Sequence, residues 1–265
     1  TNGYGGMYCN ESSPKITNCI FDNNVAYFFW MSGGGGMYNN GSSPTLTDCT
    51  FTNNSAGYDN YGGGGGMYND NSSPTLTNCS FIGNISLGSG NQAGGGAIYN
   101  LVSNPTIINC SFTGNSYQGD AAYAGGGAIR NGSSSNPTIN NCSFTENSYQ
   151  GDASSFGGGG MYNDQTSNPT VTNCTFTNNT SNADGGGIYN FCYVKNSLAN
   201  CTFIGNTASF SGGGVAGNGN FTSSTFVDNV ANDFGGGIYG NSGTVTDCSF
   251  TNNTATNGGG GLYGR

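Results

Sequence analysis

Eight of the ten cysteines recur at one position of a repeating pattern, where thiols could form disulfides, bind a metal or fill a core. They are Cys19, Cys49, Cys79, Cys110, Cys142, Cys174, Cys201 and Cys248. Zinc needs four converging ligands, which a linear row of thiols in a chain without histidine does not supply. Stacked neighbours would hold their Cβ atoms about 4.8 Å apart, whereas a disulfide prefers about 3.5–4.5 Å. We therefore expect a column of buried, inert thiols with no metal and no cofactor. Cys9 and Cys192 lie off this column, and their redox state stays open.

Carboxylates are the other residues that could do chemistry, because enzymes that cleave polysaccharides need them in clusters. The two glutamates, Glu11 and Glu146, lie far apart in the sequence. Single aspartates precede several glycine runs, at Asp59, Asp120, Asp152, Asp184 and Asp233. We favour ordinary turn roles for them and keep weak calcium binding at these loops as the alternative. We predict no catalytic residues and a non-enzymatic protein, with a polysaccharide lyase or hydrolase as the least favoured reading.

The elements that must position these residues are repeats of 23 to 32 residues, a spacing typical of solenoids. Each repeat has a glycine run that ends in an aliphatic residue, usually followed by Tyr-Asn. Each also has a phenylalanine followed three residues later by asparagine. These asparagines are Asn24, Asn54, Asn84, Asn115, Asn147, Asn179, Asn206, Asn229 and Asn253. The apolar stretches between them are too short for helices and alternate like strands.

We therefore predict an all-β, right-handed parallel β-helix of about nine coils, with three short strands per coil, as a single domain over residues 1–265. Three inward columns would fill it: the aliphatic residue after the glycines, a second aliphatic residue, and the phenylalanine. The recurring asparagine would form an inward amide ladder that bonds the coils above and below. Its role, like that of the cysteine column, would be structural.

Two co-repeating motifs suggest a family. Gly-Gly-Ala-Ile, at 95–98 and 126–129, and Phe-x-x-Asn resemble the repeats of the chlamydial polymorphic outer membrane proteins and of related bacterial surface proteins. The resemblance spans essentially the whole chain. It implies a β-helix at the cell surface, in proteins that serve as adhesins, stalks and passenger domains.

Two features are candidate contact surfaces. A tyrosine follows the inward aliphatic residue in most coils, and by alternation it would point outward. The members are Tyr38, Tyr68, Tyr99, Tyr162, Tyr189 and Tyr239, with the row interrupted at Arg130. Stacking along the sheet is the favoured role, with a glycan- or partner-binding platform as the alternative. The second feature is the apolar segment Tyr27, Phe28, Phe29, Trp30 and Met31, which would be a cap or a contact surface.

Asn-x-Ser/Thr sequons are frequent, and those in loops are candidate glycosylation sites. They are Asn10, Asn40, Asn53, Asn71, Asn131, Asn178 and Asn252.

The net charge and the two ends of the sequence indicate which classes of partner to expect. The net charge is −9 with only four basic residues, which disfavours nucleic acid and anionic membranes, and no apolar run has the length of a membrane span. Residues 1–8 and 256–263 occupy the same phase of the repeat, without obvious caps. We expect either an excerpt of a longer array or head-to-tail self-association into a fibre.

The leading hypothesis is an extracellular or cell-surface structural protein, a β-helical rod that stacks end to end, with glycans on its loops. The alternative is an adhesin or passenger domain that binds a glycan or a host partner through its aromatic residues.

Overall fold

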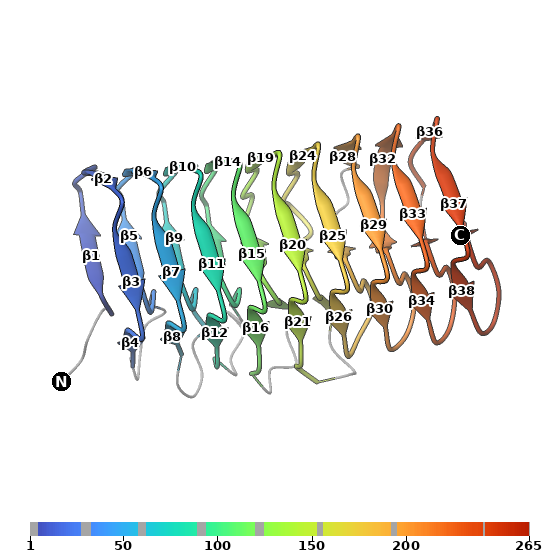
Figure 1. Cartoon of the computed structure of the whole chain (residues 1–265), viewed down its shortest axis with the longest axis horizontal. Coiled ribbons are helices and arrows are strands. Elements are labelled where there is room, and N and C mark those ends of the chain that lie inside the picture. Colours follow the sequence, from blue (N-terminus) through green and yellow to red (C-terminus); the bar gives the residue numbers. More distant parts are fainter. Residues whose placement is uncertain are drawn as a thin grey trace.

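The protein is a straight parallel β-helix in the computed structural model, which describes residues 5–27, 33–57, 62–88, 94–119, 125–152, 156–191, 195–240 and 242–264. Four sheets run along the rod, and the first and last coils lie at its opposite ends (Figure 1). Every strand pair between coils is parallel, and each coil pairs with the next one along the chain. The predicted fold class is confirmed.

The first two strands of each coil form sheets A and B. Sheet A consists of β1 (Met7–Asn10), β5 (Met37–Asn40), β9 (Met67–Asp70), β13 (Ile98–Leu101), β18 (Ile129–Gly132), β23 (Met161–Asn163), β27 (Ile188–Asn190), β31 (Val215–Gly217), β35 (Ile238–Tyr239) and β39 (Leu262–Tyr263). Sheet B consists of β2 (Lys15–Thr17), β6 (Thr45–Thr47), β10 (Thr75–Thr77), β14 (Thr106–Ile108), β19 (Thr138–Asn140), β24 (Thr170–Thr172), β28 (Asn196–Ala199), β32 (Gly219–Thr222) and β36 (Val245–Thr246).

The remaining strands form sheets C and D. Sheet C consists of β3 (Ile20–Asp22), β7 (Thr50–Thr52), β11 (Ser80–Ile82), β15 (Ser111–Thr113), β20 (Ser143–Thr145), β25 (Thr175–Thr177), β29 (Thr202–Ile204), β33 (Thr225–Val227) and β37 (Ser249–Thr251). Sheet D consists of β4 (Val25–Ala26), β8 (Ser55–Ala56), β12 (Ile85–Ser86), β16 (Ser116–Tyr117), β21 (Ser148–Tyr149), β26 (Thr180–Ser181), β30 (Thr207–Ala208), β34 (Val230–Ala231) and β38 (Thr254–Ala255). A further pair joins β17 (Gly125–Gly126) to β22 (Gly157–Gly158).

Sheet D extends the predicted count of three strands per coil to four. Its strands have only two residues each, too few for an alternating pattern to be recognised in the sequence. They follow directly on the ladder asparagine, as Ser55 follows Asn54.

Left-handed residues form two of the corners of each coil. One, between sheets B and C, has φ from 48° to 55° in every coil and is Asn, Asp or Ser, as at Asn78 and Asp247. The other, between sheets C and D, is the residue just before the ladder asparagine, such as Asn53 or Gly114. This preceding residue, and not the ladder asparagine, turns the chain, which leaves the ladder side chain pointing inward. Asparagine and glycine suit such positions because the left-handed conformation costs them least.

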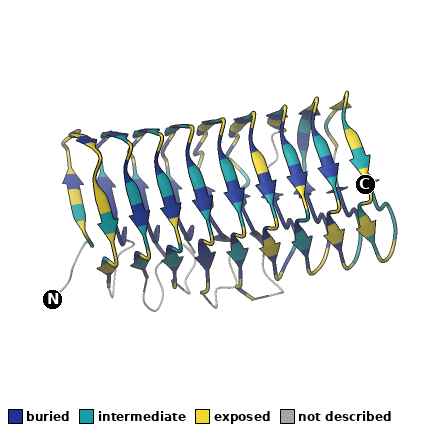
Figure 2. Ribbon diagram, in the orientation of Figure 1, coloured by how far each residue is buried: buried dark blue, intermediate teal, exposed yellow. Residues whose placement is uncertain are grey.

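The interior is filled by columns of identical or similar side chains, buried along the middle of the rod (Figure 2). The three predicted columns are confirmed: Met37 starts the buried part of one, Leu46 lies in the second and Phe51 in the third. Neighbouring phenylalanine rings are parallel, with centroids 4.5–5.1 Å apart. This separation matches the spacing of paired strands, so the backbone register sets the aromatic stack.

The predicted asparagine ladder is present along the whole rod. Asn84 shows the unit: its backbone N–H and its Nδ2 both donate to Oδ1 of Asn115, at 3.0 and 2.9 Å, and Nδ2 also donates to the carbonyl of Phe51. The same bonds repeat from coil to coil as far as Asn253. Each amide therefore closes a corner and ties it to the neighbouring coils.

A second amide ladder, which we did not predict, follows the tyrosines of sheet A. Its members are buried and bond Nδ2 to Oδ1 at 2.7–2.9 Å; they are Asn39, Asn69, Asn100, Asn131, Asn163 and Asn190. The recurrence of Tyr-Asn was visible in the sequence. Alternation places this asparagine on the same inner side as the aliphatic column. Apolar side chains are the usual occupants of that side, so the sequence did not suggest a buried amide there.

The glycine runs allow backbones to approach at the corner before sheet A. A Cβ on Gly96 would lie 2.1 Å from the carbonyl oxygen of Gly127 and 2.6 Å from the nitrogen of Ser116. Later coils also use positive φ, as at Gly185. Close approach of backbones and positive φ therefore both favour glycine at this corner.

Replacing Asn115 by alanine tests the ladder. The change removes four hydrogen bonds and leaves the backbone N–H of Asn84 and one hydrogen of its Nδ2 buried without acceptors. At about 1–3 kcal/mol for each unsatisfied group, we expect a loss of about 3–5 kcal/mol in the free energy of unfolding, measured with urea. Thr113→Ala, on the outer face of the same coil, should change it by less than about 0.5 kcal/mol. Equal losses in the free energy of unfolding for the two variants would contradict a stabilising role of the ladder.

Candidate functional site

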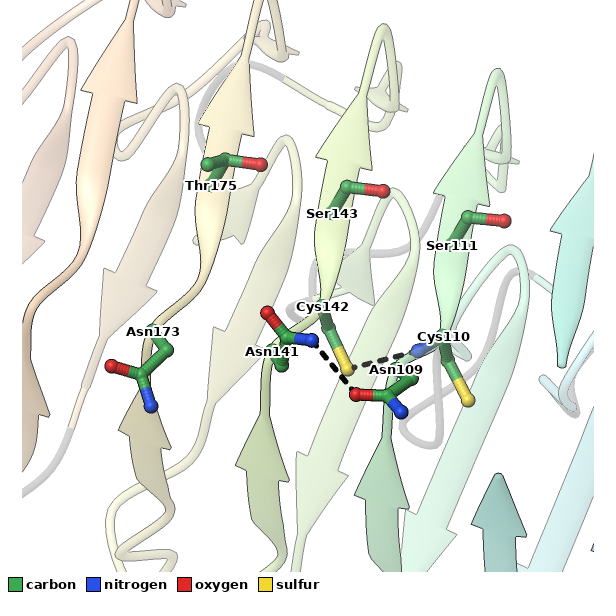
Figure 3. Close-up of a pocket in the computed structure, with 8 residues that line it drawn as sticks. All are labelled: Asn109, Cys110, Ser111, Asn141, Cys142, Ser143, Asn173 and Thr175. Carbon is green, nitrogen blue, oxygen red and sulfur yellow. Dashed lines mark hydrogen bonds between the residues drawn. The ribbon is translucent and has the colours of Figure 1, made fainter. Parts of the chain in front are cut away.

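The described surface contains a shallow groove at the corner between sheets B and C, in the middle of the rod (Figure 3). Its volume is about 280 Å³. Three successive coils contribute the lining, which consists of Asn109, Asn141, Asn173, Cys110, Cys142, Ser111, Ser143 and Thr175. Each coil thus contributes a left-handed corner asparagine and the first residue of a strand of sheet C, with the thiol between them in two of the coils.

The corner asparagines form one wall of the groove. Nδ2 of Asn141 donates to Oδ1 of Asn109 at 2.8 Å, and Nδ2 of Asn109 donates to Oδ1 of Asn78 at 3.3 Å. Asn173 donates instead to Asn140, at 2.8 Å. The second wall bears the hydroxyls of Ser111, Ser143 and Thr175, aligned along the rod (Figure 3). No charged side chain lines the groove, so its walls offer neutral donors and acceptors.

The cysteine column lies beneath these walls. Cys110 and Cys142 are 2% and 3% exposed. The backbone N–H of Cys110 donates to Sγ of Cys142 at 3.4 Å, and the same contact joins Cys79 to Cys110 and Cys142 to Cys174. The thiol of Cys142 in turn donates to the carbonyl of Asn140, at 3.3 Å. Each sulfur therefore contacts the backbone of its own coil and of the preceding one.

Interaction between the thiols shifts their pKa values in alternating directions. Interaction with the thiol of Cys110 lowers the pKa of Cys142 and of Cys79, while the same interactions raise the pKa of Cys110. Cys201, whose neighbour on one side is Ser224, has its pKa raised to about 11, mainly by burial. The chemistry of these thiols is thus set by their neighbours in the column.

The nine cysteines in the described part of the chain are free thiols, and the predicted column is present. Six of its members are buried, whereas Cys19 is exposed and Cys248 half-buried in the end coils. Cys9 is buried at the position of Asn39 in the second amide ladder. Cys192 lies outside the described residues.

The tyrosines of sheet A stack along the sheet, which confirms the favoured prediction, and they do not form the exposed contact surface that was its alternative. Tyr38, Tyr68, Tyr99, Tyr162 and Tyr189 are at most 9% exposed, and Tyr239 is half-buried. They do face away from the aliphatic column, as alternation requires. However, consecutive rings cover each other at 5.0 Å between Tyr38, Tyr68 and Tyr99.

Outer groups complete the burial of the tyrosines. The backbone at Gly132 lies against the ring of Tyr99. The rings of Phe156 and Phe191 stack beside Tyr189, with centroids 5.6 and 6.2 Å away. A second layer over a sheet cannot be recognised from alternation within one strand.

The apolar segment after the first coil is described only at Tyr27, which is 53% exposed. Phe28, Phe29, Trp30 and Met31 lie outside the described residues, so the proposal of a contact surface there stays a prediction.

Arg130 replaces a tyrosine in the outward row. Its register partners are Tyr99 and Tyr162, and its guanidinium carbon lies 4.9 and 6.0 Å from their ring centroids. The side chain is 8% exposed, and Nε and Nη1 make no hydrogen bond to any residue that the structure describes. A planar cation thus continues the aromatic stack in place of a ring.

One candidate glycosylation site is wrong. Asn131 is fully buried in the second amide ladder, between Asn100 and Asn163, and no glycan could reach its Nδ2. Asn40 is half-buried, and the remaining candidates are exposed: Asn10, Asn53, Asn71, Asn178 and Asn252. Several of these are left-handed corners, which accounts for both their residue type and their exposure.

Two of the loop aspartates, Asp184 and Asp233, make turn contacts between coils. Oδ1 of Asp184 accepts from the N–H of Ser211 at 2.8 Å, and Oδ1 of Asp233 accepts from Nδ2 of Asn257 at 2.7 Å. Burial raises the pKa of Asp184. Asp59 and Asp120 lie outside the described residues. In the described ranges, no three or more His, Cys, Asp or Glu side chains are grouped so as to hold a metal ion.

The coils, their ladders and their stacked core define a class of protein, the right-handed β-helices. A family model described as "Right handed beta helix region" matches residues 1–151 and 123–264, and the chain belongs to this family. The comparison with curated proteins found no match. Over the ranges described above, no helix is long and apolar enough to cross a membrane.

Replacing Arg130 by tyrosine tests the aromatic stack. Arg130→Tyr removes a buried cation and continues the row between Tyr99 and Tyr162, so we expect the free energy of unfolding to rise by about 1–2 kcal/mol. Arg130→Lys should lower it, because an ammonium group cannot stack as a plane. Urea unfolding measures both. A destabilised tyrosine variant would show that the guanidinium contributes more than stacking.

Proposed function

We propose that this protein is a non-enzymatic structural rod that lies outside the cell and continues end to end into a fibre. The observation that carries the proposal is the register: all four sheets step from coil to coil without a change of partner. A body built in this way gains length by adding coils, since each coil contacts only its neighbours.

Several features of the rod favour a mechanical role. Backbone bonds, two internal amide ladders and stacked rings all connect consecutive coils. Only 6% of the residues are charged. The interactions are short and run along the axis, so a load along the rod would be shared by many of them.

The ladders are directional, which suits a head-to-tail junction. At the edge of the first coil, Asn24 donates to Asn54, which leaves its own Oδ1 facing the open side. At the last coil, Oδ1 of Asn253 accepts from Asn229. The backbone N–H and Nδ2 of Asn253 would donate to the asparagine Oδ1 of a following coil. A coil of a second copy would meet the same donors and acceptors as a coil of the same chain.

Proline at Ile20 tests the junction. The residues at this position in later coils donate their N–H to the preceding coil, as Thr50 does to Cys19 and Ser80 to Cys49. The equivalent N–H of Ile20, which is 74% exposed, faces the open edge. Ile20→Pro therefore removes an edge donor and leaves the bonds within the chain in place.

We expect the unaltered chain to form fibres, seen by electron microscopy and by light scattering that grows with concentration, and Ile20→Pro to give single rods. Ile20→Thr is the matched control, since threonine occupies this position at Thr50 and keeps the N–H. Discrete rods of the unaltered chain at all concentrations would contradict the fibre, and equal fibres from all three would contradict this junction.

Two observations support a location at the cell surface. The Gly-Gly-Ala-Ile and Phe-x-x-Asn repeats resemble those of polymorphic outer membrane proteins. Exposed sequons lie at the corners, where an attached glycan would project from the rod. The adhesin alternative depended on the tyrosine row or on the apolar segment 27–31, and the burial of the tyrosines removes the first of these two platforms.

Glycosylation is tested by the intact mass of protein purified from its source. We expect a mass above the 26.9 kDa of the chain, with modification mapped to exposed corners such as Asn71 and Asn252 and none at Asn131. An unmodified mass would contradict the glycosylated surface rod.

A further inference from the structure

The free thiols in the core form a row with a regular spacing, and no part of the structural role requires sulfur there. Ser224 shows this directly, because it occupies the same position between Cys201 and Cys248. Its Oγ accepts from the N–H of Cys201 at 3.2 Å and donates to the carbonyl of Thr222 at 3.0 Å. Serine thus satisfies the same backbone contacts as cysteine, which raises the question of what the thiols add.

Spacing defines what could fit between two sulfurs. Consecutive coils are about 4.7–4.9 Å apart, which is wide for a disulfide. A metal–thiolate bond is about 2.3 Å long, so two such bonds in a line span about 4.6 Å. A two-coordinate ion between consecutive cysteines therefore fits the strand spacing with little movement. A tetrahedral ion would need two further ligands, and in the described ranges no group of three converges.

We propose that the cysteine column binds soft monovalent cations of the Cu(I) and Ag(I) type, one in each space between thiols of consecutive coils. Soft thiolate ligands select such ions. The spaces run from Cys19 to Cys201, and the column is interrupted at Ser224.

The groove gives the entry point. Cys110 and Cys142 line it, beneath the amides of Asn109 and Asn141 (Figure 3). An ion that reaches this opening meets the part of the column from Cys79 to Cys174, where each backbone N–H contacts the sulfur of the next coil at 3.4 Å. The neutral walls of the groove would neither repel a cation nor hold it as a competing site.

The charge balances in each step. Each thiol donates its proton to a backbone carbonyl, as Cys110 does to Ile108 and Cys142 to Asn140, and the incoming cation displaces one such proton. One S–H bond breaks, two metal–sulfur bonds form, and one proton leaves to solvent for each ion bound. A monovalent ion thus leaves the charge of the buried column unchanged, whereas a divalent ion would add an uncompensated charge to an apolar core.

Silver(I) is the probe for the test, with the full chain reduced beforehand and transferred to a buffer free of thiols and chloride. Native mass spectrometry counts the ions bound. Each internal cysteine borders two spaces, so Cys110→Ser should lose two silver ions. Cys248→Ser, beside Ser224, should lose none from the column, and Ser224→Cys should gain two. Cys9 and Cys192 contribute the same background to every variant.

The proposal is supported if the number of bound silver ions changes with the number of spaces between consecutive thiols, as given for the three variants. A count that changes by one for every cysteine removed or added, wherever it lies, would overturn it. Equal binding of zinc would also overturn it, because zinc prefers four ligands. Circular dichroism and thermal unfolding check the fold of each variant. Silver binding and fibre formation are separate readouts, so either proposal can fail without the other.

Discussion

In-register stacking of coils at the spacing of paired strands is the constraint on which the rest of this structure depends. Each side chain meets the same or a similar side chain one coil away, so any group that tolerates its own copy at about 4.8 Å can form a column. Phenylalanine satisfies this by parallel stacking and asparagine by pairing its amide donor with the acceptor of the next copy. Charged side chains do not satisfy it, because like charges would repel along the whole rod. The low content of charged residues follows from the same rule.

Corners impose the second requirement. Left-handed residues turn the chain between sheets B and C and between sheets C and D, and asparagine, aspartate, serine and glycine occupy most of these positions. The residue after the second corner then points into the core. There Asn54 and its equivalents donate to the carbonyl of the phenylalanine in the preceding coil, which is Phe21 for Asn54. Turn chemistry and core chemistry are therefore linked in one short segment. Phe-x-x-Asn recurs in every coil because the carbonyl of each phenylalanine accepts from the ladder asparagine of the next coil, as Phe21 does from Asn54 and Phe51 from Asn84.

Positions that break a column show how strict the rule is. Arg130 enters the tyrosine row because its flat guanidinium can lie against rings on both sides. Ser224 enters the cysteine column because its hydroxyl reproduces the contacts of a thiol. Each exception keeps the shape or the hydrogen bonds of its column and changes the chemistry.

The sequence by itself determined the class of fold, the length of the repeat and the identity of the core columns, because these depend on periodicity and side-chain type alone. It also indicated the Asn24–Asn253 ladder and the free thiols, since stacking geometry is the same in any coil of this kind. Only the tertiary structure decided that Tyr68 is covered, that Asn131 is part of a ladder and that Cys110 borders a groove. These outcomes depend on neighbours from other coils and on groups that lie over a sheet. Alternation within one strand shows which way a side chain points, and it contains no information about what lies beyond it.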